Sequence, residues 1–161
     1  EVGVSEAALY RHFPSKTKMY EGLIDYIEDI LFSRIRIILK EKPDVASCCY
    51  KILKLLLTFS ERNPGFTRLL TGDALTGETD RLHIRIRQLF DRIEAQLKQI
   101  LREAEMTNNI RTTCSTKASA NMILALAEGR MSQFVRSGFN YSPTENWQDQ
   151  WSVVMVGFFR D

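Results

Sequence analysis

The sequence has little of what most enzymes need. Histidine occurs only twice, as His12 and His83, and there is no glycine-rich phosphate loop, nucleophile elbow or metal-ligand spacing. The neighbouring acids Glu28 and Asp29 diverge by about 100° on a helix, so they do not form an acid/base pair. We therefore expect a protein that is not an enzyme, with no catalytic residues, no metal and no cofactor.

Cysteine is also scarce, with three in the chain. Cys48 and Cys49 are neighbours in sequence, and Cys114 has no partner at CxxC spacing. This pattern does not support a disulfide framework, and we expect a reducing, cytoplasmic compartment. No apolar run approaches the ~20 residues of a membrane span, since even ILKLLLTF is interrupted by Lys54, so we expect no membrane insertion. The net charge of +2 is too small to indicate nucleic-acid binding by itself.

The sequence is rich in helical periodicity. Its 161 residues, 44% of them apolar, are enough for one hydrophobic core, with or without a small additional module. Apolar residues recur in steps of three or four, which predicts helices over about 15–40, 44–62, 66–75, 80–104 and 117–139. A last helix is expected from Ser142, where Ser-Pro-Thr-Glu offers a capping serine, a proline at the first helical position and a glutamate at the third. The fold class is therefore all-α.

The first fifteen residues contain a more specific motif. After the turn at Gly3, Ser5 can cap a short helix over about 5–13, which Pro14 ends. Small residues in its first turn would let the backbone approach base edges, and polar groups around its end could bind phosphates, as in the recognition helix of a helix-turn-helix. The candidate DNA-binding residues are Ser5, Ala7, Ala8, Tyr10, Arg11, His12, Ser15, Lys16 and Lys18.

The stretch VGVSEAALYRHFPSK resembles the recognition-helix signature of the TetR family, which has a Gly-Val-Ser turn, a short helix ending in Leu-Tyr-Xaa-His-Phe, and a Ser-Lys start to the next helix. The resemblance implies a TetR-like fold, in which residues 1–18 are the remnant of a DNA-binding domain and residues 19–161 form a helical dimerisation and partner-binding domain. It also implies that a first helix and most of a second are missing before Glu1, and such a truncated chain is expected to bind DNA poorly.

Later segments carry a closer resemblance. IEDILFSRI, ERNPGFTRLLTGDAL, QLFDRIEAQLKQILRE and FVRSGFNYSPT are similar to the nucleoid occlusion factors within the TetR family. Those proteins bind specific chromosomal sites as dimers and, while bound, antagonise polymerisation of the tubulin-like division protein FtsZ, so that septa do not form over unsegregated DNA. The resemblance implies the same function here, at the nucleoid in the cytoplasm.

A possible partner groove can be outlined from two of the predicted helices. Each carries an apolar residue off its core stripe, followed by an arginine, so two such helices side by side would form a groove with an apolar floor and basic ends. Alternatively, the apolar residues simply lie at the edge of the core. The resemblance implies that the conserved C-terminal tail of FtsZ docks between these helices. The candidate groove residues are Tyr26, Ile30, Arg34, Leu55, Thr58, Arg62 and Asn63.

A homodimer is expected from the last two helices. Small residues alternate with large ones along 117–139, and two tryptophans lie on the final helix, which favours close helix packing across an interface. The candidate interface residues are Leu126, Met131, Phe134, Trp147, Trp151 and Met155.

The main alternative function is a ligand-responsive TetR-family repressor with a small-molecule pocket in its larger domain. A polar cluster deep in that domain would favour it. The predicted core stripes are almost entirely aliphatic, with Glu128 and Arg130 as charges inside the 117–139 helix, so no small-molecule ligand is expected. A helical dimer module without a DNA role would require the opening motif to be a coincidence.

Overall fold

The computed structural model describes residues 15–78 and 80–161, and this part of the chain is helical, as predicted. Its elements are α2 (Lys16–Lys40), α3 (Val45–Arg62), α4 (Pro64–Leu70), the 3-10 helix η1 (Asp73–Leu75), α5 (Asp80–Asn108), α6 (Thr116–Arg136) and α7 (Trp147–Met155). Within these ranges, β pairing is limited to an isolated bridge between Thr112 and Phe159. The predicted recognition helix at 5–13 and the candidate DNA-binding residues from Ser5 to His12 lie outside the described residues.

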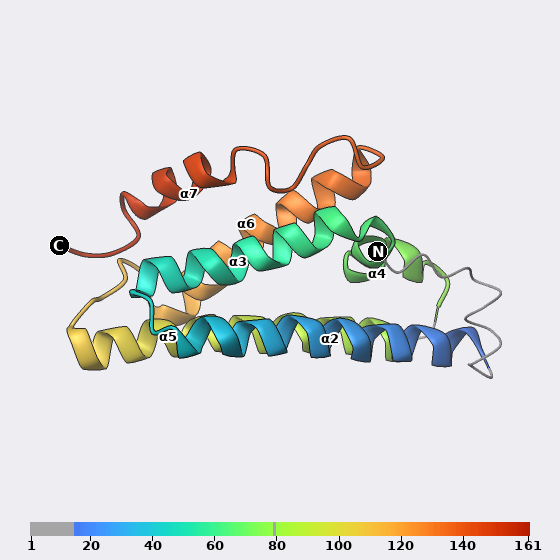
Figure 1. Ribbon diagram of the computed structural model, residues 1–161, viewed down its shortest axis with the longest axis horizontal. Helices are drawn as coiled ribbons and strands as arrows, with labels where there is room; N and C mark the ends of the chain where they lie inside the picture. Colours follow the sequence, from blue (N-terminus) through green and yellow to red (C-terminus); the bar gives the residue numbers. More distant parts are fainter. Residues whose placement is uncertain (1–14, 79) are drawn as a thin grey trace.

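The helices stack around α3. In Figure 1, α2 and α5 run side by side along the bottom, α3 and α6 cross above them, and α7 lies above α3. Helix α3 contacts each of the other α-helices of the described chain. It accordingly buries a broad face, which comprises Cys48, Cys49, Ile52, Leu53, Leu56, Leu57, Phe59 and Ser60.

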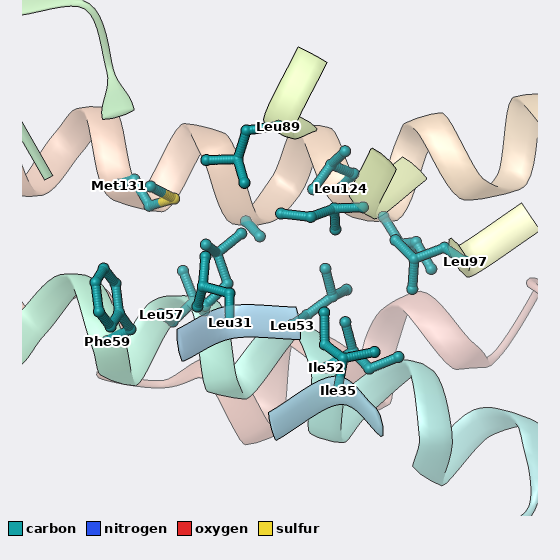
Figure 2. Packing of buried hydrophobic residues seen from close by; sticks show 14 of the residues in the cluster. Leu31, Ile35, Ile52, Leu53, Leu57, Phe59, Leu89, Leu97, Leu124 and Met131 are labelled. Carbon is teal, nitrogen blue, oxygen red and sulfur yellow. The ribbon is translucent and has the colours of Figure 1, made fainter. Parts of the chain in front are cut away.

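The core is filled with branched aliphatic side chains. Figure 2 shows Leu31 and Ile35 of α2 packed with Leu53 and Leu57 of α3 beneath Leu124 of α6. Full burial of one such side chain contributes about 1.5–3 kcal/mol to folding. Cys48 and Cys49 belong to this core, whereas Cys114 is exposed. Burial raises the pKa of the Cys49 thiol to about 12.

Helix α2 is joined to α5 by a row of ion pairs. Glu21 lies 2.6 Å from Arg81 and 3.2 Å from Lys18. One turn further on, Asp25 lies 2.5 Å from Arg85. The guanidinium of Arg92 lies 3.8 Å from the centre of the Phe32 ring, in a cation–π contact. Because the paired residues advance together along both helices, the row holds α2 and α5 parallel.

Two helix starts are as predicted. The Ser15 hydroxyl accepts a hydrogen bond from the Lys18 N–H at 3.1 Å, and the Asp44 carboxylate accepts one from the Ser47 N–H at 3.0 Å. Helix α5 is longer than predicted and continues to Asn108, where Asn109 takes a left-handed φ of 55° and ends it. The polar loop predicted at 107–115 is correspondingly shorter.

The predicted cap at Ser142 is wrong. Helix α7 begins only at Trp147, because Asn146 adopts a left-handed φ of 59° that interrupts any helix from Ser142. The Ser142 hydroxyl donates instead to the carboxylate of Glu61 on α3. A tertiary partner has therefore replaced the local cap, and residues 143–146 form a turn.

The corner between α3 and α4 is tightly held. Helix α4 begins at Pro64, two residues earlier than the predicted 66–75 helix. Gly72, with a left-handed φ of 83°, separates it from η1. The fully buried Thr67 hydroxyl lies 2.8 Å from the Ser60 carbonyl oxygen and 3.0 Å from that of Asn63. This one side chain thus adds a buried donor at two carbonyls of the corner, which also accept from the backbone N–H groups of Asn63 and Thr67 at 3.2 Å and 3.0 Å.

A surface hollow lies between α4, α5 and α6. It has a volume of about 390 Å³ and is lined by Glu94 and Glu128 together with apolar residues such as Phe90 and Leu124. Burial, together with the nearby Glu94 charge, raises the pKa of Glu128. The other buried polar side chains of the described chain are scattered through the fold. They are Glu21, Ser60, Thr67, Thr112 and Ser119.

Replacing Thr67 with valine should destabilise the protein by about 1–2 kcal/mol, because the shape is kept while a buried hydrogen bond to the Ser60 carbonyl is lost. Urea unfolding measures the change. Thr71→Val is the matched control, since the hydrogen bond from the Thr71 hydroxyl to the Arg68 carbonyl is exposed, and its cost should stay under about 0.5 kcal/mol. Equal losses in the two variants would contradict the role assigned to Thr67.

Replacing Glu128 with glutamine should stabilise the protein at pH 7. A carboxyl group whose folded pKa is raised disfavours folding once it ionises, so wild-type stability falls as pH rises from below 4.5 through the raised pKa. The difference between variant and wild type should therefore vanish below pH 4.5, the ordinary pKa of this carboxyl. Thermal unfolding across this pH range tests it, with the exposed Asp149→Asn as the control.

Candidate partner-binding groove

The seven candidate groove residues line one hollow. It lies between α2 and α3 and has a volume of about 190 Å³, and Phe59 and Phe66 complete its lining. Steps of four along α2 bring Tyr26, Ile30 and Arg34 onto one face. Steps of three and four do the same for Leu55, Thr58 and Arg62 on α3. Because the two helices are antiparallel, the last turn of α3 lies near the middle of α2 (Figure 1).

Aromatic rings form one end of the hollow. The Tyr26 ring meets the Phe66 ring edge-on, with centroids 6.1 Å apart, and Phe66 stacks on Phe59 at 6.1 Å. Such pairs contribute about 0.5–1.5 kcal/mol beyond simple burial. Sequence reasoning missed Phe66 because it belongs to α4, beyond the Asn63-Pro64-Gly65 corner. Phe59 could have been found, since it lies four positions after Leu55.

Both arginines of the groove lack a carboxylate partner. Neither Arg34 nor Arg62 forms an ion pair with any residue in 15–78 or 80–161, and both are exposed. By contrast, Arg81, Arg85 and Arg92 of α5 all face acids. Unpaired guanidinium groups beside an apolar floor favour an anionic ligand that also carries apolar side chains.

Asn63 adds an oriented amide. Its Nδ2 donates to the Phe59 carbonyl oxygen at 2.9 Å, which fixes the side chain at the end of α3. Among the described residues, its Oδ1 accepts no hydrogen bond and remains free to accept one from a ligand N–H.

The described DNA-binding candidates lie at the start of α2. Ser15 caps the helix, Lys18 pairs with Glu21 at 3.2 Å, and Lys16 lies 2.9 Å from Glu78. Both lysine side chains remain about half exposed, at 47% for Lys16 and 54% for Lys18.

Four of the candidate dimer residues are already buried in the single chain. Met131, Phe134, Trp147 and Trp151 are each at most 6% exposed. Trp151 packs against Trp147 at 6.0 Å and against Tyr50 of α3 at 5.9 Å. The two tryptophans therefore complete the core of the chain itself and have little surface left for a second copy.

Other apolar side chains of these helices do face outward. Leu126 is 40% exposed, and Met155 is half-buried. Sequence reasoning missed Met122, Val153 and Val156, which are 43%, 73% and 87% exposed. Met122 and Leu126, four positions apart, lie on the face of α6 away from its buried residues, such as Ile123. Their spacing relative to the buried residues could have predicted this exposed apolar face from the sequence.

Two further features bear on the type of site. No helix in the described ranges is long and apolar enough to cross a membrane. The same residues contain no group of three or more His, Cys, Asp or Glu side chains placed to hold a metal ion.

The chain has close relatives and a structural neighbour. Residues 44–158 match the family SlmA-like_C, described as a Tetracyclin repressor-like, C-terminal domain. The Nucleoid occlusion factor SlmA of Idiomarina loihiensis is 55% identical over 95% of this chain and 78% of its own. The protein of that name from Shewanella woodyi is 57% identical over 96% and 78%, and that from Shewanella frigidimarina is 52% identical over 99% and 81%.

Among solved structures, a transcriptional regulator FadR from Bacillus subtilis in complex with stearoyl-CoA superimposes with a TM-score of 0.77, over 97% of this chain and 83% of that one. Its identity of 14% shows a shared fold alone. The all-α class predicted from periodicity and the TetR-like fold implied by the opening motif are thereby confirmed. Taken with the relatives at 52–57% identity, the match over residues 44–158 shows that the chain belongs to the SlmA family of TetR-like proteins.

Proposed function

We propose that this protein is a DNA-binding nucleoid occlusion factor that, bound to chromosomal sites as a dimer, antagonises FtsZ polymerisation and blocks septum formation over the nucleoid. The observation that carries the proposal is the groove between α2 and α3, where apolar side chains lie beside two arginines that form no ion pair with the described residues. The name shared by the relatives, Nucleoid occlusion factor SlmA, supports the same role and a location at the nucleoid.

The groove chemistry suits the C-terminal tail of FtsZ as a short peptide with apolar anchors and acidic flanks. Apolar side chains of the tail would pack on Tyr26, Ile30 and Leu55, over the Phe66 ring. Its carboxylates would meet Arg34 and Arg62, and a backbone N–H could donate to Asn63 Oδ1.

Helix α2 connects this groove to the proposed DNA site. Residues 1–18 would supply the DNA contacts, with residues 19–161 as the dimerisation and partner-binding domain. Ten residues of helix, about 15 Å, separate Lys16 from Tyr26. A continuous helix whose first half is joined to α5 by ion pairs offers a route for coupling, and such coupling has to be reciprocal between DNA and FtsZ.

Dimer formation is proposed to use the outward faces of α6 and α7. Exposed Met122 and Leu126 on α6, with Val153 at the end of α7, offer apolar surface that a second copy would cover. The residues buried in the single chain, such as Trp147 and Trp151, would support this surface from beneath.

The alternative of a ligand-responsive repressor has less support. Its pocket would require a polar cluster inside the helical domain, and the carboxylates of Glu94 and Glu128 instead line a hollow that opens at the surface. No specific observation favours a small-molecule effector over the peptide groove.

Sedimentation of FtsZ polymers with GTP tests the partner role. The full-length protein, added with a duplex that carries its chromosomal site, should lower the pellet. Arg34→Ala and Arg62→Ala should each weaken tail binding about tenfold and restore the pellet. Arg36→Ala is the matched control, because Arg36 is an exposed arginine of the same helix outside the groove. An unchanged pellet with wild type, while the duplex is still bound, would point to a conventional repressor.

Analytical ultracentrifugation tests the dimer. Leu126→Glu should shift the protein to monomer, because the substitution places a charge in a surface that a second copy has to desolvate. Met106→Glu provides the control, since Met106 is 85% exposed near the end of α5 and lies on neither α6 nor α7. A Leu126→Glu protein that remains dimeric would rule out this face.

A further inference from the structure

The last turn of α3 is tied to a distant part of the chain through one carboxylate. Glu61, next to Arg62 of the groove, accepts hydrogen bonds from the hydroxyls of Ser142 and Thr144, the latter at 2.9 Å. The two hydroxyl oxygens lie 3.2 Å apart. About eighty positions of sequence separate these groups from Glu61, so the contact is tertiary and has no role in local helix formation.

The segment that supplies those hydroxyls is itself held in place. We call residues 137–146, between α6 and α7, the α6–α7 connection. Arg130 of α6 donates from Nη2 to the carbonyl oxygens of Ser142 at 3.0 Å and Glu145 at 2.6 Å. Its Nε lies 3.5 Å from the Pro143 carbonyl oxygen. One planar guanidinium thus gathers three carbonyl groups of the turn, which a lysine could not do.

These contacts lead from α6 to the edge of the groove. Arg130 fixes the connection, the connection fixes Glu61, and Glu61 precedes the two groove residues Arg62 and Asn63. Helix ends fray unless their groups find partners. The Arg62 side chain has no described partner of its own, so its position depends on the backbone turn that Glu61 anchors.

We propose that Glu61 is a positioning residue for the groove: its bonds to Ser142 and Thr144 hold the last turn of α3, and so determine how tightly the groove binds its acidic partner. This rests on the proposed function, because the FtsZ tail is the ligand in question. Glu61, Ser142 and Thr144 do not line the hollow, so their effect is transmitted through the helix end.

Whether substitution of Glu61 weakens or tightens peptide binding distinguishes a positioning role from simple electrostatic repulsion. The Glu61 carboxylate repels an acidic peptide, so loss of its charge alone would tighten binding. Positioning predicts the reverse for Glu61→Ala, which loses the acceptor. Glu61→Gln should retain near-native binding, because an amide oxygen still accepts from both hydroxyls.

The experiment measures the affinity of a fluorescent FtsZ tail peptide by anisotropy at fixed salt. Glu61→Ala should weaken binding about tenfold, whereas Glu61→Gln should stay within about twofold of wild type. A Ser142→Ala, Thr144→Val double variant keeps the Glu61 charge and should also weaken binding. Adding Glu61→Ala to it should cost nothing more, because both changes remove the same contact. Asp149→Ala, which removes one exposed negative charge on α7, is the control.

Tighter or unchanged binding by a folded Glu61→Ala protein would overturn the positioning role, as would additive losses in the combined variant. Should Glu61→Ala fail to fold, as judged by circular dichroism, the Ser142 and Thr144 double variant tests the same contact from its other side. If wild type itself does not bind the peptide and Arg62→Ala changes nothing, the proposed function fails instead.

Discussion

The packing of α3 against five other helices is the constraint from which the rest of the molecule follows. This helix contacts α2, α4, α5, α6 and α7, and its apolar residues lie at the centre of the packing seen in Figure 2. A helix enclosed in this way can expose only a narrow strip. On α3 that strip includes Leu55, Thr58 and Arg62, which is why the groove lies where it does. The core and the groove are opposite faces of one helix.

Helix α2 is constrained differently. Its inner face packs with the core at Ile27 and Leu31, while acidic side chains on its flank meet the arginines of α5. Exposed ion pairs contribute little each, about 0–1 kcal/mol, so the row is better understood as fixing the register of α2 than as stabilising the fold. The remaining strip of α2 carries Tyr26 and Arg34, and Arg34 has no acidic partner within the described part of the chain.

Local periodicity was enough to predict most of the helices and to bring the groove candidates of each helix onto one face, because both depend on steps of three or four within one helix. The choice of these two helices as a partner site came from the family resemblance, and Asn63 lies past the end of α3. It failed where a second element intervenes. Phe66 reaches the groove from α4 around a corner held by Thr67, and the Ser142 hydroxyl is taken by Glu61. The tryptophans of α7 show a third limit, since an apolar stripe does not reveal whether its own chain or another copy will cover it.

The distribution of cysteines makes this protein unusually convenient for spectroscopy. Cys48 and Cys49 lie inside the core, where burial keeps their thiols protonated by raising the pKa of each, while Cys114 lies exposed between α5 and α6. A thiol-reactive dye applied to the native protein should therefore attach at one position only. Cys114 follows the bridge between Thr112 and Phe159, so the label would report on the contact between the α5–α6 loop and the C-terminal segment without any engineered residue.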